Sequence, residues 1–562
     1  MCALEAVALA LLAITAGEPQ TDPPRLLPVG PLPARVVHAF DLTASDLDLR
    51  LAATTLQGQV NRDEGRVYLF YNDPERGTAR FWLDELKRKG YIDDFDIDAM
   101  DAYFARYAPE TDRVIVYDPA VPDTINVATM IASVEGGMVI APAHIDRFGG
   151  GKEVVDLRGR WSDGVAAYAW AFDTLWPRMN PRVLASLHPT HARHQLRDYL
   201  VRNRIFTFYI PAPDADPALT ERGKALMAEV FRAAGPNTPV IGWWDGGHLD
   251  AGLTEYGGVG WAGRFGMLTV GSNWQDNASL LSGIPAPLDA IAQRFRERPT
   301  PATPALEPDK VYVCFAIMES GDAPSYWPHV QKSVWDDPQR GAIPIAWTLN
   351  PLLFEFLPSV GEWFVEQAGP NDCFIMAISG PGYVHPYRDF MADAADPEAA
   401  WRDYLHLTGG YMQRWGLPDL ALYTDAWLPF DRARQDPVTR RFTQGLPGLR
   451  MLILGMGRDD AITETSPHYE LDGVFVSHIF TRWDAANIGR GAENNRWLAD
   501  EIRKRTPPER PGFMFVHPLS WSYHPSDLVA VMELLGDDYV AVGPASLMQL
   551  WKTAENDKET TR

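Results

Sequence analysis

The chain is organised around the stretch Phe374-Ile375-Met376-Ala377-Ile378-Ser379-Gly380-Pro381-Gly382-Tyr383-Val384-His385-Pro386-Tyr387. Its first five residues are apolar and predict a short buried strand. Two glycines around a proline then interrupt regular structure and force a turn. Tyr383 and His385 follow at once. Because α/β proteins build their sites at the C-terminal ends of strands, this turn predicts either a ligand-facing loop or a purely steric glycine turn.

Short apolar runs of this kind recur from Lys310 onward and are mostly separated by helix-length segments. Strands that are apolar on both faces and alternate with helices indicate a parallel sheet that is covered on both sides. Seven or eight of them predict a (β/α)7–8 barrel-like domain over residues 310–552. The predicted strands are 311–318, 342–347, 373–379, 420–424, 451–456, 473–477, 513–516 and 539–542.

The preceding residues predict further α/β sandwich units, because apolar strands alternate there with amphipathic helices over short connections. We place a first α/β domain at 36–146 and a second at 147–298, each with a mostly parallel sheet. The second includes a loop rich in tryptophan and glycine. The proline-rich residues 299–309 predict a linker to the barrel.

The N-terminal residues are typical of an export signal. The apolar run from Ala6 to Gly17 has the length of a signal peptide and is too short to span a bilayer, although Glu5 stands where a basic residue is expected. We therefore expect residues 1–17 to be a signal peptide of a periplasmic or extracellular protein. The proline-rich residues 18–35 predict an extended tether. No later segment predicts membrane insertion.

The composition limits the classes of molecule that the protein is expected to bind. The 562 residues carry a formal net charge of −23, which disfavours nucleic acid and anionic lipid surfaces as partners and suits a neutral substrate. The three cysteines form neither a disulfide framework nor a zinc motif. Oligomeric state is not predicted.

Carboxylates and aromatic rings follow several of the predicted barrel strands. Glycosidic bonds are cleaved by one protonated and one ionised carboxyl group, and aromatic faces bind sugar rings. We predict Asp322 and Asp425 as the catalytic pair, acting on a neutral oligo- or polysaccharide. The predicted substrate contacts, some of them in the loop from Trp243 that we expect to narrow the cleft, are Glu319, Trp327, Tyr383, His385, Trp427, Asp484, His517, Trp521, Trp244 and Glu255.

Three of these stretches also resemble one family. Gly380-Pro381-Gly382-Tyr383-Val384-His385-Pro386 resembles the signature of the GxGYxYP family of "putative glycoside hydrolases", with His385 in place of the second tyrosine. Thr55-Leu56-Gln57-Gly58-Gln59-Val60-Asn61-Arg62 is similar to the family's N-terminal signature, and Ser320-Gly321-Asp322 to an Asp-Gly-Asp-like turn. The resemblance covers roughly residues 36 to 552 and implies a multidomain carbohydrate-active protein.

Two other functions stay open. A non-catalytic carbohydrate-binding protein would keep the aromatic cleft without needing a carboxyl pair. A metal-dependent carbohydrate deacetylase or hydrolase would combine Asp322 with His478, His517 or His524, but no His-x-x-His or His-Glu-x-x-His spacing in the barrel indicates a metal site. The paired glycines at 246–247 and 257–258 lack a strand–turn–helix context, so no cofactor is predicted.

Overall fold

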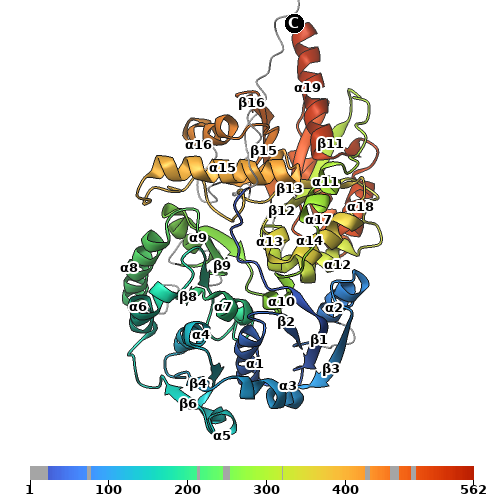
Figure 1. The fold of residues 1–562 in the computed structure, drawn as a ribbon. Helices are drawn as coiled ribbons and strands as arrows, with labels where there is room; N and C mark the ends of the chain where they lie inside the picture. Colours follow the sequence, from blue (N-terminus) through green and yellow to red (C-terminus); the bar gives the residue numbers. More distant parts are fainter. Residues whose placement is uncertain are drawn as a thin grey trace, which may run out of the picture.

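The computed structural model describes residues 23–72, 77–211, 216–244, 253–318, 321–424, 431–455, 468–481 and 489–561. The N-terminal half forms three small parallel sheets, and the C-terminal half forms a barrel (Figure 1). The predicted fold class, α/β units with parallel sheets followed by a (β/α) barrel, is thereby confirmed. The predicted signal peptide, residues 1–17, lies outside the described residues.

The first two sheets have three strands each, and both are parallel throughout. In the order β2-β1-β3, the first sheet contains β1 (Pro33–Asp41), β2 (Gly65–Phe70) and β3 (Asp94–Ala99), with helices α1 (Leu47–Val60), α2 (Thr78–Arg88) and α3 (Met100–Tyr107). In the order β5-β4-β6, the second contains β4 (Arg113–Val116), β5 (Met138–Ile140) and β6 (Glu153–Asp156), with helices α4 (Thr124–Glu135), α5 (Ile145–Phe148) and α6 (Gly164–Leu175). The boundary that we place at residue 147 falls inside this second sheet.

The third sheet is the one that faces the barrel. In the order β10-β9-β7-β8, it consists of β7 (Leu184–Ser186), β8 (Phe206–Phe208), β9 (Pro239–Gly242) and β10 (Leu268–Gly271), all parallel. Its helices are α7 (Arg197–Asn203), α8 (Pro217–Ala234), α9 (Glu255–Arg264), α10 (Ala278–Leu281) and α11 (Leu288–Arg296).

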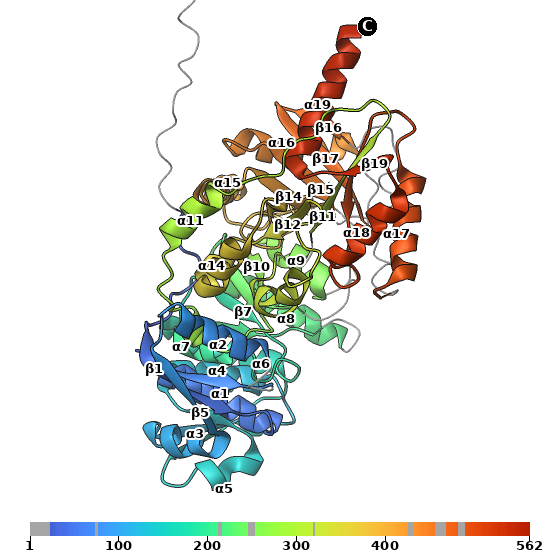
Figure 2. The same cartoon turned by 90° about the vertical axis from the view of Figure 1, so that its right-hand side faces the viewer.

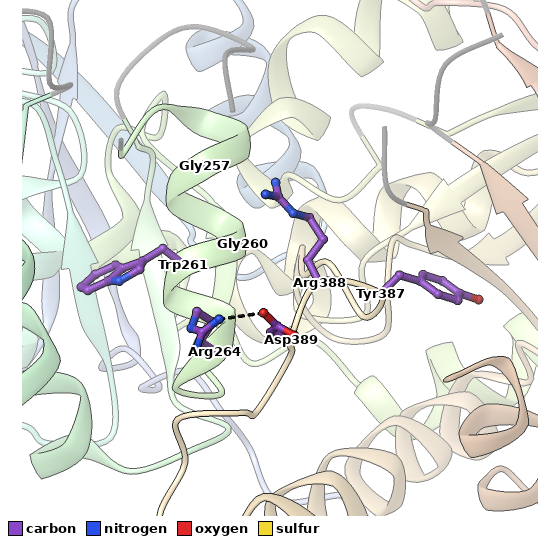
Figure 3. A pocket seen from close by; sticks show the side chains of 7 residues that line it. All are labelled: Gly257, Gly260, Trp261, Arg264, Tyr387, Arg388 and Asp389. Carbon is purple, nitrogen blue, oxygen red and sulfur yellow. Dashed lines mark hydrogen bonds and ion pairs between the residues drawn. The ribbon is translucent and has the colours of Figure 1, made fainter. Parts of the chain in front are cut away.

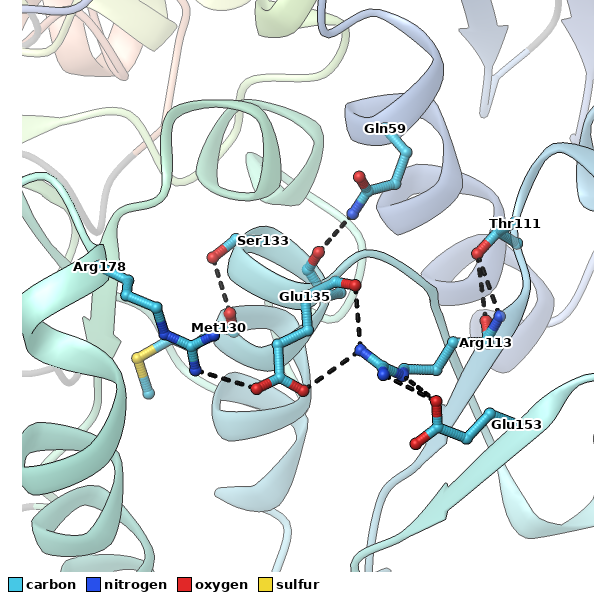
Figure 4. A network of polar contacts seen from close by, with 9 residues as sticks. Gln59, Thr111, Arg113, Met130, Ser133, Glu135, Glu153 and Arg178 are labelled. Carbon is cyan, nitrogen blue, oxygen red and sulfur yellow. Dashed lines mark hydrogen bonds and ion pairs between the residues drawn. The ribbon is translucent and has the colours of Figure 1, made fainter.

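The family-like stretch at the end of α1 joins the first sheet to the other two. Gln57 donates from Nε2 to Oδ1 of Asn277 over 2.7 Å, and Asn61 donates from Nδ2 to Oγ of Ser279 over 3.0 Å. Both bonds are buried, and both partners follow β10 of the third sheet. Gln59 donates to a carbonyl of α4 beside the second sheet, where Glu135 also lies in a network of ion pairs (Figure 4). These contacts make the stretch a structural junction between the three sheets.

Seven parallel strands close the barrel. In order around the ring they are β11 (Val311–Ile317), β12 (Ile345–Leu349), β13 (Asp372–Met376), β14 (Asp419–Tyr423), β15 (Met451–Gly455), β17 (Val474–Thr481) and β18 (Gly512–His517), and pairing of β11 with β12 completes the circle. The helices around them are α12 (Lys332–Trp335), α13 (Leu353–Phe356), α14 (Pro358–Gln367), α15 (Pro397–Trp415), α16 (Arg432–Gly445), α17 (Ala492–Arg505), α18 (Pro525–Leu535) and α19 (Pro544–Thr561). Helix α19 projects away from the rest of the molecule (Figure 2).

The eighth predicted strand lies outside the ring. β19 (Tyr539–Ala541) pairs with the first half of β11, whereas β12 pairs with its second half. A further strand, β16 (His468–Leu471), pairs antiparallel with β17. Alternate residues of β11 belong to two separate cores, Val313 and Phe315 to one and Cys314 and Ala316 to the other, because successive side chains of a strand point to opposite faces. In the described part of the chain, no helix combines the length and the apolar character that crossing a membrane requires.

The proline-rich segment before β1 is anchored to the barrel by Glu355. Its Oε2 atom accepts hydrogen bonds from the backbone N–H groups of Leu26 and Leu27, both over 2.9 Å, and its Oε1 atom accepts one from the hydroxyl of Tyr411 over 2.6 Å. Glu355 is buried. The described part of the predicted tether therefore lies in the seam between the N-terminal domains and the barrel (Figure 1).

We expect Glu355→Ala to lower the free energy of unfolding by roughly 2–4 kcal/mol, because two buried N–H groups lose their acceptor. Thermal and denaturant unfolding would measure this loss. The control is Glu398→Ala in the same barrel, whose exposed ion pair with Arg441 should leave the free energy of unfolding nearly unchanged. Equal stability of the two variants would contradict the anchoring role.

Candidate active site

The glycine turn after β13 is held between two neighbouring elements. Gly380 has a φ of 91°, a conformation that favours glycine, and a Cβ atom there would stand 2.7 Å from the hydroxyl of Tyr404 in α15. That hydroxyl donates to the carbonyl of Ser379, and Oγ of Ser379 accepts the backbone N–H of Tyr423 in β14 over 2.9 Å. The Ile378–Ser379 peptide bond is cis. The turn is thus a fixed part of the barrel.

The same turn pairs with the third N-terminal sheet. The backbone N–H of Tyr383 donates to the carbonyl of Thr269 in β10 over 2.7 Å. A Cβ atom on Gly382 would lie 2.8 Å from Cβ of Leu268, so the two backbones approach this closely only because position 382 is glycine. The candidate site therefore lies where the barrel mouth meets a different domain.

Five rings gather at this junction. Tyr383 and His385 come from the turn, Tyr423 from the end of β14, Tyr256 from α9 and Trp243 from the residue after β9. The ring centroid of His385 lies 4.3 Å from that of Tyr256 and 4.7 Å from that of Tyr423, and the ring of Tyr383 stacks on Trp243 at 6.0 Å. Burial, aided by the charge of Arg388, lowers the pKa of His385 well below its usual value, so its imidazole is neutral near pH 7.

Two carboxyl groups lie at this cluster. Burial raises the pKa of Tyr383 and Tyr423 well above the usual value, and the charges of Glu255 and Asp322 raise the pKa of both hydroxyls further. The two hydroxyls also share a hydrogen bond. Asp322 and Glu255 therefore act electrostatically on the same pair of hydroxyl groups, although they come from opposite sides of the domain boundary.

The two carboxyl groups differ in setting. Glu255 is the first residue of α9, and burial raises its pKa to about 7, against a lowering effect of its hydrogen bond with Trp243. Asp322 is buried in the turn after β11, where its carbonyl accepts a hydrogen bond from Nδ2 of Asn350 over 3.0 Å. A Cβ atom on the preceding Gly321 would stand 1.8 Å from the carbonyl oxygen of Thr348, so this turn sits tightly against β12.

A pocket of about 400 Å³ opens between α9 and the residues that follow the turn (Figure 3). A Cβ atom on Gly260 would lie 3.4 Å from Nδ1 of His385 and 3.7 Å from Nη1 of Arg388. The guanidinium of Arg388 reaches toward α9 and lies 4.8 Å from the ring centroid of Tyr256, whereas Tyr387 points the other way. The lining residues are Gly257, Gly260, Trp261, Arg264, Tyr387, Arg388 and Asp389.

Other predicted site residues lie elsewhere. Trp327 is fully buried against Phe364, with ring centroids 4.7 Å apart. Trp244 is buried too, and its indole N–H donates to Oγ1 of Thr269 over 3.0 Å. His517 is buried, with Nδ1 3.0 Å from the carbonyl of Ala316 and 3.1 Å from the backbone N of Met318, at the ends of β18 and β11.

Trp521 is exposed beside Tyr326. The predicted residues Glu319, Asp425, Trp427 and Asp484 lie outside the described residues, so their roles stay predictions. Within the described ranges, no three or more His, Cys, Asp or Glu side chains form a group that could hold a metal ion.

Three residues of the cluster were missed by the sequence reasoning, namely Trp243, Tyr256 and Tyr423. Tyr423 ends a predicted strand, so the rule that identified Asp425 could have identified it as well. Tyr256 directly follows the predicted Glu255. Trp243 and Trp244 are neighbours with different contacts, since Trp243 stacks on Tyr383 and Trp244 donates to Thr269, and only the structure reveals which of them faces the cluster.

These features define an α/β-barrel protein with a buried, carboxylate- and tyrosine-containing site that is completed by an N-terminal domain. Four family models match the chain in sequence order, and it belongs to the GxGYxYP family. They are described as the "GxGYxYP_N 1st domain" (residues 36–107), the "GxGYxYP_N second domain" (112–179), the "GxGYxYP third domain" (181–283) and the "GxGYxYP putative glycoside hydrolase C-terminal domain" (309–552). The resemblance seen in the three sequence stretches is therefore confirmed.

A solved structure has the same fold. The crystal structure of a "putative hydrolase" from Bacteroides thetaiotaomicron VPI-5482 matches with a TM-score of 0.75 and 18% sequence identity, and the match covers 96% of this chain and 98% of that one. A "putative polysaccharide deacetylase" from Mycobacterium smegmatis matches with a TM-score of 0.29 and 11% identity over 46% of this chain and 96% of that one, which is too weak to indicate a shared fold. No curated protein sequence matched the chain.

Proposed function

We propose that this protein is a glycoside hydrolase whose active site lies between the barrel mouth and α9. Glu255 is the general acid, and Asp322 is the second carboxyl group, which acts as nucleophile or base. The observation that carries the proposal is the gathering of Tyr383, Tyr423 and Trp243 at the domain boundary, with the buried Asp322 on the barrel side and Glu255 at the start of α9. Both carboxyl groups raise the pKa of the two tyrosine hydroxyls, and glycosidases use two carboxyl groups in separate roles.

The proposed role of each carboxyl group depends on whether that group carries a proton. With a pKa of about 7, the carboxyl of Glu255 keeps its proton in a large fraction of molecules at neutral pH and can pass it to the leaving oxygen. An ionised Asp322 would stabilise the positive charge that develops on the sugar. Trp243 offers an aromatic surface beside both, which supports a sugar as the substrate.

The second carboxyl predicted from the sequence, Asp425, directly follows Thr424 at the end of the strand that carries Tyr423. It is therefore the alternative partner for Asp322, and the experiment must include it. The strongly acidic chain supports a neutral oligo- or polysaccharide as substrate. Export, expected from residues 1–17, fits a polymer that is degraded outside the cytoplasm.

The test is a screen of the purified protein against aryl glycosides and neutral polysaccharides, repeated with Asp322→Asn, Glu255→Gln and Asp425→Asn. The matched control is Asp289→Asn, since the Asp289 side chain is 93% exposed in an ion pair with Arg414. Hydrolysis by the wild type and the control, and its loss in Asp322→Asn, would support the proposal. Activity that survives all three substitutions, or that a chelator abolishes and zinc restores, would overturn it.

The pH dependence of activity follows from Glu255. Because burial raises its pKa to about 7, kcat/KM should fall above that pH, by about tenfold per unit, as the acid loses its proton. Glu255→Gln should remove this limb of the profile. A wild-type profile that stays flat from pH 6 to 9 would contradict the assignment.

The thermal stability of the protein gives an independent measure of the raised pKa of Glu255. A carboxyl whose folded-state pKa is raised destabilises the fold progressively as pH rises from its unfolded value to its folded value. Glu255→Gln should therefore unfold at a higher temperature than the wild type at pH 8, with the difference vanishing near pH 4.

A further inference from the structure

Trp274 and Trp521 are the only strongly exposed aromatic side chains in the described ranges, with exposed fractions of 46% and 47%. The other large apolar side chains with similar exposure are aliphatic. Single exposed apolar residues are ordinary, but these two contact the same ring. The centroid of Tyr326 lies 6.1 Å from that of Trp274 and 5.1 Å from that of Trp521.

The three rings come from both sides of the domain boundary. Trp274 follows β10 of the third N-terminal sheet, Tyr326 follows β11, and Trp521 follows β18 of the barrel. Tyr326 is itself buried, and its hydroxyl is 3.2 Å from Oγ of Ser520. The two exposed tryptophans therefore contact one buried tyrosine, Trp274 with its ring 29° from the tyrosine plane and Trp521 with its ring at 87°. We call this set the tryptophan platform.

The platform is directly connected to the candidate active site. Only three residues separate Tyr326 from Asp322, and Oγ of the intervening Ser325 donates to the carbonyl of Gly271 over 3.3 Å. A Cβ atom on Gly271 would lie 2.7 Å from Cβ of Ala323 and 3.1 Å from the ring of Trp243. The platform and Asp322 thus lie on one short, tightly packed segment where the barrel mouth meets the third N-terminal sheet.

We propose that the tryptophan platform is a subsite that binds a further sugar ring of a neutral oligo- or polysaccharide whose cleaved bond lies near Asp322. This inference rests on the proposed function and extends it: the substrate must contain more than one sugar ring, so that it reaches both Asp322 and the platform. Exposed indoles beside a polar catalytic centre suit sugar rings, whose C–H faces pack on aromatic faces while their hydroxyl groups stay hydrated. The N-terminal domains would then take part in recognition, because Trp274 belongs to them.

The experiment compares the wild type with Trp274→Ala and Trp521→Ala by affinity electrophoresis in gels that contain β-glucan, xylan, arabinan, galactomannan or starch. Trp161→Ala is the matched control, because Trp161 is a partly buried tryptophan that also pairs with another ring, 5.2 Å away, in the second domain. At least one polymer should retard the wild type. Each platform variant should bind that polymer roughly 3- to 10-fold more weakly, and the control should bind it normally.

Kinetics provide a second readout. The KM for the longest soluble oligosaccharide should rise in both platform variants by a similar factor, whereas Trp161→Ala should leave this KM unchanged. Trp274→Phe and Trp521→Phe, which keep a ring, should recover most of the binding. Should one alanine variant fold poorly, as judged by its thermal midpoint, the other carries the same prediction from a different domain.

No retardation of the wild type by any polymer, or equal retardation of all variants, would overturn the subsite. Failure of the proposed function looks different, because binding needs no catalysis. If Asp322→Asn still hydrolyses the substrate but Trp274→Ala no longer binds the polymer, the catalytic assignment fails and the subsite stands.

Discussion

Asp322→Asn is expected to lower kcat roughly 10²- to 10⁴-fold on every substrate that the protein cleaves, whatever its leaving group. The substitution replaces the buried carboxyl group by an amide of nearly the same size, which cannot ionise. In the proposed mechanism the carboxylate acts on the sugar rather than on the departing oxygen, so an activated leaving group cannot replace it. Initial rates on a poor and an activated aryl glycoside would measure this loss.

Two controls make that result specific. The hydrogen bond from Nδ2 of Asn350 goes to the backbone carbonyl of Asp322, so it survives the substitution and the turn should keep its structure. An unchanged thermal midpoint would verify this. Asp289→Asn, on the surface of α11, should keep full activity. Asp322→Asn with more than about a third of the wild-type rate would rule out its catalytic role.

Glu255→Gln is expected to show the opposite dependence on the leaving group. A glycoside with a poor leaving group needs a proton from the acid and should lose roughly 10²- to 10⁴-fold in rate. A dinitrophenyl glycoside departs without that proton and should lose less than about tenfold. Leaving-group dependence therefore separates the acid from the carboxylate, which a single rate measurement does not.

The same comparison decides between Glu255 and Asp425. If Asp425→Asn, rather than Glu255→Gln, spares only the activated substrate, the acid is the residue predicted from the sequence, and Glu255 serves the substrate in another way. The wild-type pH profile should agree with the result. Loss of the alkaline limb in one variant identifies the group whose proton is used.

The barrel was predictable because each of its strands can be recognised from a few consecutive residues. Each ring strand is a short apolar run, and such a run can be buried on both faces only in a covered parallel sheet. The last predicted strand, β19, forms as predicted but lies outside the ring. Its sequence is as strand-like as the others, but whether it enters the ring depends on how one edge of β11 is divided between β19 and β12, while the other edge pairs with β18. That division is a long-range pairing that no local pattern records.

The candidate site was predictable in part. Tyr383 and Asp322 follow strand ends, and the barrel geometry brings such positions to one mouth. Trp327 follows the same rule but packs into the core, because a position at the mouth does not specify the direction of its side chain. Sequence reasoning placed Glu255 in a long loop, and it became a partner for Asp322 only when α9 was seen against the glycine turn.

The sequence by itself determined the parallel α/β barrel, the glycine turn that is followed by a tyrosine and a histidine, and membership of the GxGYxYP family. Apolar periodicity and glycine positions act over a few residues, so a linear reading captures them. Only the tertiary structure decided that two domains meet at the candidate site, that Trp243 rather than Trp244 contacts its ring cluster, and that Trp274 and Trp521 contact the same tyrosine. These contacts join distant segments through packing, and packing is a property of the whole fold.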